Sequence, residues 1–110
     1  MWLMTTTGFY SVVRKPGDAD LTVRARVCAD LDALREHWLP ELGPTQQHAG
    51  TDYPCRARVS AQAFSEAVRK LALAIDYPNF KDEVGRVQGK PRAHAYSRVW
   101  SALLELERDR

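Results

Sequence analysis

Two short stretches with paired arginines are the part of this sequence whose residue types and spacing best suit chemistry. They are Val-Arg-Ala-Arg-Val at residues 23–27 and Cys-Arg-Ala-Arg-Val at residues 55–59. A guanidinium is planar, contacts carboxylates and phosphates through two hydrogen bonds at once, and stacks on aromatic rings. Because arginine alternates with alanine or valine, both stretches have the period of a half-buried β-strand. The repeat therefore predicts two strands whose arginines share one face of a sheet.

We expect a neighbouring strand to add two more side chains to this arginine face. This holds if Phe9, Ser11 and Val13 point inward, because Tyr10 and Arg14 then point outward. Aromatic and arginine side chains on an exposed sheet are used by proteins that bind single-stranded nucleic acid. The leading hypothesis is a small non-catalytic binding or regulatory module for an anionic partner such as single-stranded nucleic acid. Its predicted binding residues are Tyr10, Arg14, Arg24, Arg26, Arg56 and Arg58.

A second interpretation of the arginine face needs no ligand. One face of a sheet commonly meets water and must be polar, and arginine stems cover apolar backbone well. The last helix could also fold over this face, with Glu105 and Glu107 pairing with the arginines. One tyrosine is, moreover, fewer aromatic side chains than the two or three that a nucleic-acid platform usually carries. The sequence leaves both interpretations open.

No set of residues has the spacing of a known catalytic or metal site. The histidines are His37, His48 and His94, and none lies at ligand spacing from another. We therefore predict no metal and no cofactor. His48 precedes Asp52 in a polar loop, and such a pair can act as acid and base. A small enzyme that uses this loop is the third hypothesis, although loops of this composition are usually only solvated.

Length and charge restrict the classes of protein that remain. The chain has 110 residues, 45% of them hydrophobic and 27% charged, which is typical of one folded domain spanning residues 1–110. Its formal net charge of +2 argues against a protein that binds polyanions through bulk charge. Only four of its sixteen basic residues are lysines. This arginine bias favours specific ion pairs or anion contacts, although GC-rich codon usage would produce the same bias.

The two cysteines, Cys28 and Cys55, are predicted to be free thiols. Strand alternation places Cys28 on the arginine face and Cys55 on the core face, which makes a disulfide between them unfavourable. The apolar residues 1–4 are followed at once by Thr5–Gly8 and follow no basic region, so they predict neither a signal peptide nor a membrane span. We therefore expect a cytoplasmic protein in a reducing compartment, with no membrane partner.

Apolar periodicity and turn residues predict the elements. A strand from about residue 2 to 15, with a bend or bulge at Gly8, should form a hairpin with a strand at 21–27. A helix capped by Asp30 and ended by Pro40, and a strand at 53–59, should follow. Two further helices should begin after Ser60 and Asn79, and the last helix follows a break at 89–91.

These elements predict the fold class α+β in a ββαβαα arrangement, with a three-stranded mixed sheet and helices packed on one face. The first two strands should form an antiparallel hairpin. Because a helix joins the second strand to the third, those two strands should be parallel with a right-handed crossover. The first strand is the most apolar, so we expect it in the middle, which gives the strand order 2-1-3.

The sequence contains more apolar surface than a three-stranded sheet and two helices need. Leu73 falls on the far side of its helix from Phe64, at about 100° per residue. Large aromatic side chains also occur in the last helix, and aromatic residues are favoured at protein interfaces. The second hypothesis is therefore a homodimer or protein–protein module that acts through the C-terminal aromatic helix. Its predicted interface residues are Leu73, Tyr96 and Trp100. Burial of these residues within the monomer is the alternative.

Three segments also form a combined pattern. They are Met-Trp-Leu-x-Thr-x-x-Gly-Phe-x-Ser-Val-Val at residues 1–13, Asp-Tyr-x-Asn-Phe-Lys at residues 76–81, and Val-Trp at residues 99–100. In these segments the chain resembles a family of short uncharacterised bacterial proteins, and the resemblance spans nearly its whole length. Tyr10 and Pro78 depart from the family pattern. The resemblance implies a bacterial, cytosolic protein with one domain, and it implies no activity.

Overall fold

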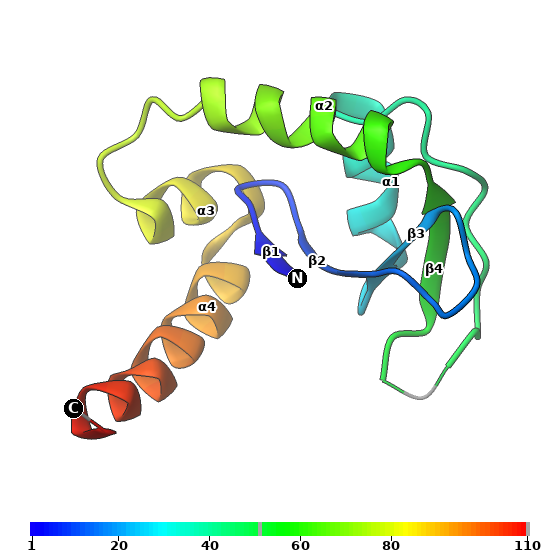
Figure 1. Cartoon of the computed structure of the whole chain (residues 1–110). Coiled ribbons are helices and arrows are strands. Elements are labelled where there is room, and N and C mark those ends of the chain that lie inside the picture. The colour runs from blue at the N-terminus through cyan, green and yellow to red at the C-terminus, as the bar shows by residue number, and fades with distance from the viewer. Residues whose placement is uncertain (51, 110) are drawn as a thin grey trace. The chain divides into compact units, whose positions relative to one another are not determined.

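A computed structural model describes residues 1–50 and 52–109, and the chain divides into two units, Met1–Ile75 and Asp76–Arg110. The first unit contains a sheet and two helices, and the second contains helices (Figure 1). The α+β class predicted from the sequence is confirmed. The elements of the first unit are β1 (Trp2–Met4), β2 (Phe9–Val13), β3 (Leu21–Ala25), α1 (Cys28–His37), β4 (Cys55–Val59) and α2 (Ala61–Leu73). Within the described residues, no helix has the length and apolar character needed to cross a membrane.

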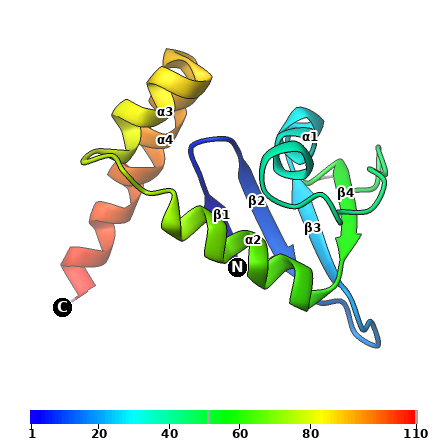
Figure 2. The same cartoon turned by 90° about the horizontal axis from the view of Figure 1, so that it is seen from above.

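The sheet has four strands in the order β1-β2-β3-β4, and every neighbouring pair is antiparallel (Figure 2). The predicted three-stranded mixed sheet with the order 2-1-3 is therefore wrong. The first predicted strand is two strands, because the chain reverses direction between Thr5 and Gly8. The Thr5 amide donates to the Gly8 carbonyl at 2.9 Å, and the Gly8 amide donates to the Thr5 hydroxyl at 3.1 Å.

The parallel crossover expected between the second and third predicted strands is also absent. Ala25 at the end of β3 lies opposite Cys55 at the start of β4, so β4 runs back along β3. A disulfide joins Cys28 to Cys55, with their Cα atoms 5.3 Å apart. The free thiols predicted from strand alternation are therefore wrong. Alternation does not extend to Cys28, because β3 ends at Ala25 and Cys28 is the first residue of α1.

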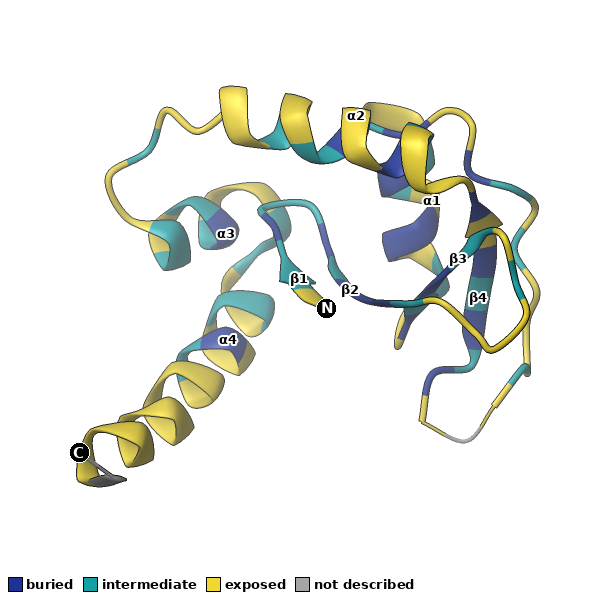
Figure 3. Cartoon of the chain, in the orientation of Figure 1, coloured by how far each residue is buried: buried dark blue, intermediate teal, exposed yellow. Residues whose placement is uncertain are grey.

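Both helices of the first unit pack on the same face of the sheet, as expected from the sequence. Leu31 and Leu34 of α1, and Phe64 and Ala67 of α2, belong to one buried cluster together with side chains of β2, β3 and β4 (Figure 3). The strand residues in this cluster are Tyr10, Val12, Val23, Ala25, Cys55, Ala57 and Val59. This cluster fixes which face of each strand points away from the helices.

Two polar residues near the core attach β2 to α1. The Tyr10 hydroxyl donates to the Asp30 carbonyl at 2.8 Å, and the Phe9 amide donates to the Asp30 carboxylate at 3.0 Å. Asp30 is therefore not the N-cap that the sequence predicted, because α1 already begins at Cys28. The predicted cap of α2 is confirmed, since the Ser60 hydroxyl accepts a hydrogen bond from the Ala63 amide at 3.1 Å.

The second unit contains α3 (Phe80–Gln88), α4 (Lys90–Leu103) and a 3-10 helix (Leu104–Asp109). Asn79 caps α3 as predicted, accepting from the Asp82 amide at 2.9 Å. Gly89, with a φ of 97°, separates α3 from α4 at the expected break. The rings of Phe80 and Tyr96 stack with their centroids 6.0 Å apart, which places Tyr96 in the packing of this helical pair.

Candidate functional site

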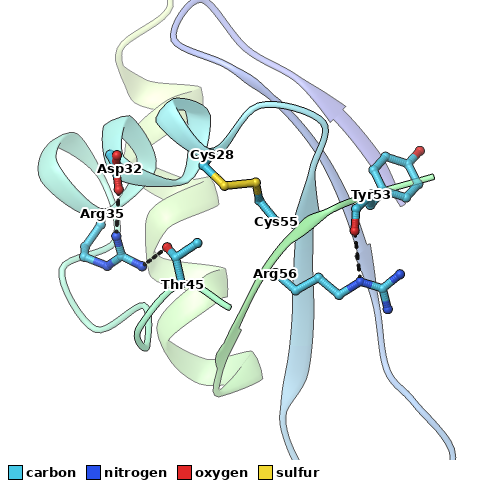
Figure 4. The surroundings of a disulfide bond; sticks show 7 residues. All are labelled: Cys28, Asp32, Arg35, Thr45, Tyr53, Cys55 and Arg56. Carbon is cyan, nitrogen blue, oxygen red and sulfur yellow. Dashed lines mark hydrogen bonds and ion pairs between the residues drawn. A yellow bond between two sulfur atoms is a disulfide. The ribbon is translucent and has the colours of Figure 1, made fainter. Parts of the chain in front are cut away.

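The sheet face that points away from α1 and α2 carries the candidate site, and we call it the outer face. One row of this face crosses all four strands, because Trp2 is paired with Ser11, Ser11 with Arg24, and Arg24 with Arg56. Figure 4 shows the Arg56 side chain on the opposite side of β4 from the disulfide. The outer face consists of Trp2, Met4, Phe9, Ser11, Val13, Thr22, Arg24, Arg56 and Arg58.

The structure places only part of the predicted arginine face together. Arg24, Arg56 and Arg58 lie on the outer face. Tyr10 does not, because its side chain is fully buried in the core, so its predicted place on the arginine face is wrong. Arg14 lies beyond the end of β2, is exposed, and donates to the carbonyl of Ala19 in the following turn.

Arg26 lies just beyond the end of β3, next to the outer face, and contacts an aromatic ring that Arg24 also contacts. Its guanidinium carbon lies 4.9 Å from the centre of the Tyr53 ring, and that of Arg24 lies 4.7 Å from the same ring. Tyr53 is buried, with 5% of its surface exposed. A ring under two guanidinium groups stabilises both cations through its negative face.

Arg24 and Arg56 are cross-strand partners, and two like charges directly opposite each other destabilise a sheet. Several neighbours offset this repulsion. Arg24 donates to the Ser11 hydroxyl at 2.6 Å. Arg56 donates to the Tyr53 carbonyl at 3.2 Å, as Figure 4 shows. Arg56 also pairs with the Asp52 carboxylate at 3.7 Å. Each of the two guanidinium groups therefore has its own acceptors, and the one carboxylate in the cluster is paired with Arg56.

The electrostatics of this cluster are visible in the pKa of Asp52 and in one nitrogen of Arg24. Backbone hydrogen bonds from Asp52 itself and from Tyr53, with the charges of Arg24 and Arg56, hold the pKa of the exposed Asp52 carboxyl below its usual value. The Nε of Arg24 is buried and has no hydrogen-bond partner among the described residues. Among these residues, Arg24 and Arg56 therefore have one carboxylate beside them, and the Arg24 Nε hydrogen has no acceptor.

Aromatic side chains occupy the β1 and β2 end of the outer face. The rings of Trp2 and Phe9 meet edge to face, with their centroids 5.8 Å apart, and 71% of the Trp2 surface is exposed. The sequence prediction missed this pair, because it placed Phe9 in the core and Tyr10 outside. The outer face therefore combines two aromatic rings with three arginines.

A pocket of about 520 Å³ lies at the β4 end of the outer face. Three cations and one carboxylate line it, namely Lys15, Arg56, Arg58 and Asp18. The remaining lining residues are Thr22, Gly43, Pro44, Gln46, Ala49 and Ala57. Arg58 and Asp18 form an exposed ion pair at 3.5 Å. The pocket has a formal excess of positive charge and is suited to an anion.

One wall of this pocket is a segment that hydrogen-bonds along the free edge of β4. The Gly43 amide donates to the Arg58 carbonyl at 2.9 Å, and Gln46 and Arg56 exchange backbone hydrogen bonds at 2.7 and 2.9 Å. Arg35 of α1 fastens this wall, since it donates to the Gly43 carbonyl at 2.6 Å and to the Thr45 hydroxyl at 3.0 Å (Figure 4). The wall is therefore attached to the helical layer as well as to the sheet.

The other predicted sites are not assembled in the same way. His48 is exposed with a φ of 57°, and the Asp52 carboxylate accepts from the Tyr53 amide and pairs with Arg56, so Asp52 has partners other than the histidine expected for an enzyme. Within residues 1–50 and 52–109, no three histidine, cysteine or acidic side chains gather as metal ligands.

The predicted interface residues Leu73 and Trp100 are exposed, as a protein interface requires. Tyr96 is 7% exposed, so it presents little surface to a partner.

Comparisons with known proteins add no relative. No protein-family model matches the chain, and neither a curated protein nor a solved structure is significantly similar to it. The resemblance to a bacterial family described above therefore stays a prediction. The function must be argued from the outer face itself.

Proposed function

We propose that the outer face binds an anionic partner, and that single-stranded nucleic acid fits it best. The observation that carries this proposal is the row on which Trp2 shares the outer face with Arg24 and Arg56, with the Phe9 ring packed edge to face against Trp2. Aromatic rings stack on bases of any sequence, and guanidinium groups pair with the phosphates between them. A four-stranded sheet that stacks two or three bases in this manner is a recurring form of RNA recognition.

The positions of the two kinds of side chain support this proposal. The rings lie on β1 and β2, and the arginines lie on β3 and β4. Neighbouring strands are about 4.8 Å apart, so the backbones of Trp2 and Arg56 are separated by about 14 Å across three such steps. A short single strand lying across the sheet would therefore place bases on the rings and phosphates on the arginines.

The charge of the cluster supports an anion rather than water as its partner. Two opposed arginines destabilise the sheet unless acceptors surround them, and a phosphate between Arg24 and Arg56 would convert this repulsion into two attractive contacts. The net charge of +2 means that this contact must be local. We expect about three phosphate contacts, which corresponds to a slope of log affinity against log salt near −2 for a single strand.

The test is fluorescence anisotropy of a labelled single strand of about twelve nucleotides, a length within known site sizes. Affinity is measured at about 50 and 200 mM salt. The variant Arg24→Ala/Arg56→Ala should weaken binding and reduce the salt slope by about 1.4, because two phosphate contacts are lost.

The matched control is Arg69→Ala/Lys70→Ala, which removes the same two charges from exposed positions on α2, a helix on the other face. We expect it to retain the salt slope of the native chain. Circular dichroism must show that both variants are folded. Absence of binding at low salt, or equal losses in the two double variants, would contradict the proposal.

A second candidate function is self-association or protein docking through α4. The observation that favours it is a group of exposed apolar side chains at the C-terminal end of this helix, Val99, Trp100 and Leu103. Exposed apolar clusters of this kind mark interaction surfaces in many proteins. Light scattering of the native chain and of Trp100→Ala/Leu103→Ala tests it. A monomer at high concentration in both would exclude the homodimer.

The cytoplasmic location stays a proposal as well. It was inferred partly from free thiols, and the Cys28–Cys55 disulfide removes that argument, because such bonds persist mainly in oxidising environments. Counting free thiols in the protein isolated under thiol-blocking conditions tests the location. Two blocked thiols support a reducing compartment, and none contradicts it.

A further inference from the structure

We propose that the pocket at the β4 end of the outer face holds the terminal phosphate of the bound strand, so that the protein recognises a phosphorylated strand end. This inference rests on the proposed function and specifies how the strand lies on the sheet. It assigns a separate role to the pocket residues Lys15 and Arg58, which lie beyond the Trp2–Arg56 row.

The first argument is geometric. A strand that crosses the outer face from Trp2 towards Arg56 reaches the wall formed by residues 43–46, which is hydrogen-bonded along the edge of β4 (Figure 1). Arg35 holds this wall to α1 through three acceptors, the carbonyls of Leu42 and Gly43 and the Thr45 hydroxyl. Gly43, Gln46 and Arg56 all line the pocket, so a strand that follows this row reaches the pocket.

The second argument is charge. A phosphate monoester carries about −1.5 to −2 charges at pH 7 and presents three strong acceptor oxygens, whereas a linking phosphate carries one charge. Lys15, Arg56 and Arg58 line the pocket, and Asp18 is its one acidic lining residue. The excess of positive charge at this end therefore matches a terminal phosphate better than an internal one.

Asp18 is the group that an entering phosphate must displace. Its pair with Arg58 is 3.5 Å long, and the two side chains are 31% and 57% exposed. Exposed ion pairs of this kind contribute little to stability. Exchanging the carboxylate for a doubly charged phosphate is therefore favourable for Arg58, which can turn towards the pocket without loss of a buried contact.

The third argument is space. The pocket volume of about 520 Å³ lies in the range of small-ligand sites, so it has room for a phosphate and the sugar attached to it. Gly50 lies against the Arg56 guanidinium, since a Cβ at that position would lie 2.4 Å from a terminal nitrogen of Arg56.

The experiment compares one strand sequence in three forms, with hydroxyl ends, with a 5′-phosphate and with a 3′-phosphate. Native protein, Arg58→Gln, Lys15→Gln and the control Arg69→Gln are titrated by anisotropy. We expect a phosphate at one end to strengthen binding about tenfold, the size of one charge-assisted hydrogen bond. Arg58→Gln and Lys15→Gln should each reduce this gain, and Arg69→Gln should retain it.

The hydroxyl-ended strand separates this inference from the proposed function. If it binds the native protein and neither phosphate adds affinity, strand-end recognition is wrong and the proposed function stands. A gain that is equal at both ends, or that survives in Arg58→Gln, shows general charge attraction and also overturns the inference. If no form of the strand binds, the proposed function fails and the inference fails with it.

Discussion

Opening the Cys28–Cys55 disulfide should strongly destabilise the first unit. The bond connects the start of α1 to the start of β4 across a sequence separation of 27 residues. Closing a loop of this length lowers the entropy of the unfolded chain, and the chain-entropy relation gives about 3.5 kcal/mol at 25 °C. Small domains have total stabilities of about 5–15 kcal/mol, so this is a large share.

Reduction and mutation separate the cross-link from packing. In the reduced native chain both sulfurs remain, so the loss measures the cross-link alone. Cys28→Ala/Cys55→Ala also removes the Cys55 side chain, which is 4% exposed in the core, and should lose about 1 kcal/mol more. We therefore expect the free energy of unfolding to be highest for the oxidised chain, lower for the reduced chain and lowest for the double variant.

The assay is equilibrium unfolding in urea, followed by circular dichroism with and without dithiothreitol. The double variant is the control for the reductant, because it should give the same curve in both conditions. The reasoning is refuted if oxidised and reduced native chains differ by less than about 1 kcal/mol, well below the expected range. It is also refuted if the unreduced protein, unfolded in air, titrates two free thiols.

Four further predictions concern the outer face and its support. Tyr10→Phe removes the buried hydrogen bond to the Asp30 carbonyl and should lower the free energy of unfolding by about 1 kcal/mol, as measured in urea; an unchanged midpoint would contradict this. Gly8→Ala should be destabilising by about 1–3 kcal/mol, because its Cβ would lie 2.3 Å from the Tyr10 hydroxyl. The same substitution should cost less in a Tyr10→Phe background but should still destabilise, because the Cβ would also lie 2.7 Å from Cζ of the Tyr10 ring. An equal cost in both backgrounds would show that the hydroxyl adds nothing to the clash. Asp52 has a pKa below its ordinary value of about 3.9, so its stabilising contribution is present above that pH and is lost as pH falls through the lowered pKa. Native and Asp52→Asn chains should therefore differ in stability at neutral pH and converge in acid, and a difference that is independent of pH would contradict the assignment. Asp52→Asn should also bind a single strand more tightly than the native chain at neutral pH, because Arg56 loses a competing carboxylate.

The sequence predicted those elements whose signals are local. Ser60 and Asn79 each accept the amide three residues later, as their residue types suggested. The break at Gly89 and the turn at Gly17 coincide with positive φ angles, which glycine adopts without strain. These features depend on a few neighbouring residues, so tertiary packing had little power to change them.

Strand order and direction depend on contacts that the local pattern does not contain. The segment from Trp38 to Pro54 returns the chain to the end of β3, and nothing in its composition distinguishes this return from a parallel crossover. The two cysteines could have indicated the strand direction. A disulfide between Cys28 and Cys55 places the start of β4 beside the end of β3, and two neighbouring strands arranged in this way are antiparallel.

The candidate site was predicted in part for the same reason. Alternation identified Arg24, Arg56 and Arg58 correctly, because both arginine strands contain small apolar residues in the other phase. In β2 the residues of both faces are mostly apolar or aromatic. Alternation therefore could not show whether Phe9 or Tyr10 points into the core. The deciding fact is the hydrogen bond from Tyr10 to Asp30, which lies 20 residues away. The pocket wall likewise depends on Arg35, whose acceptors lie in a loop without periodicity.

The most direct test of the proposed function is amide chemical-shift mapping of the native chain during titration with a single strand. The account predicts shifts at Trp2, Phe9, Arg24, Arg56 and Arg58, including the Trp2 indole N–H, with little change along the exposed side of α2. Shifts confined to α1, α2 or residues 76–109, or no shifts at low salt, would contradict it.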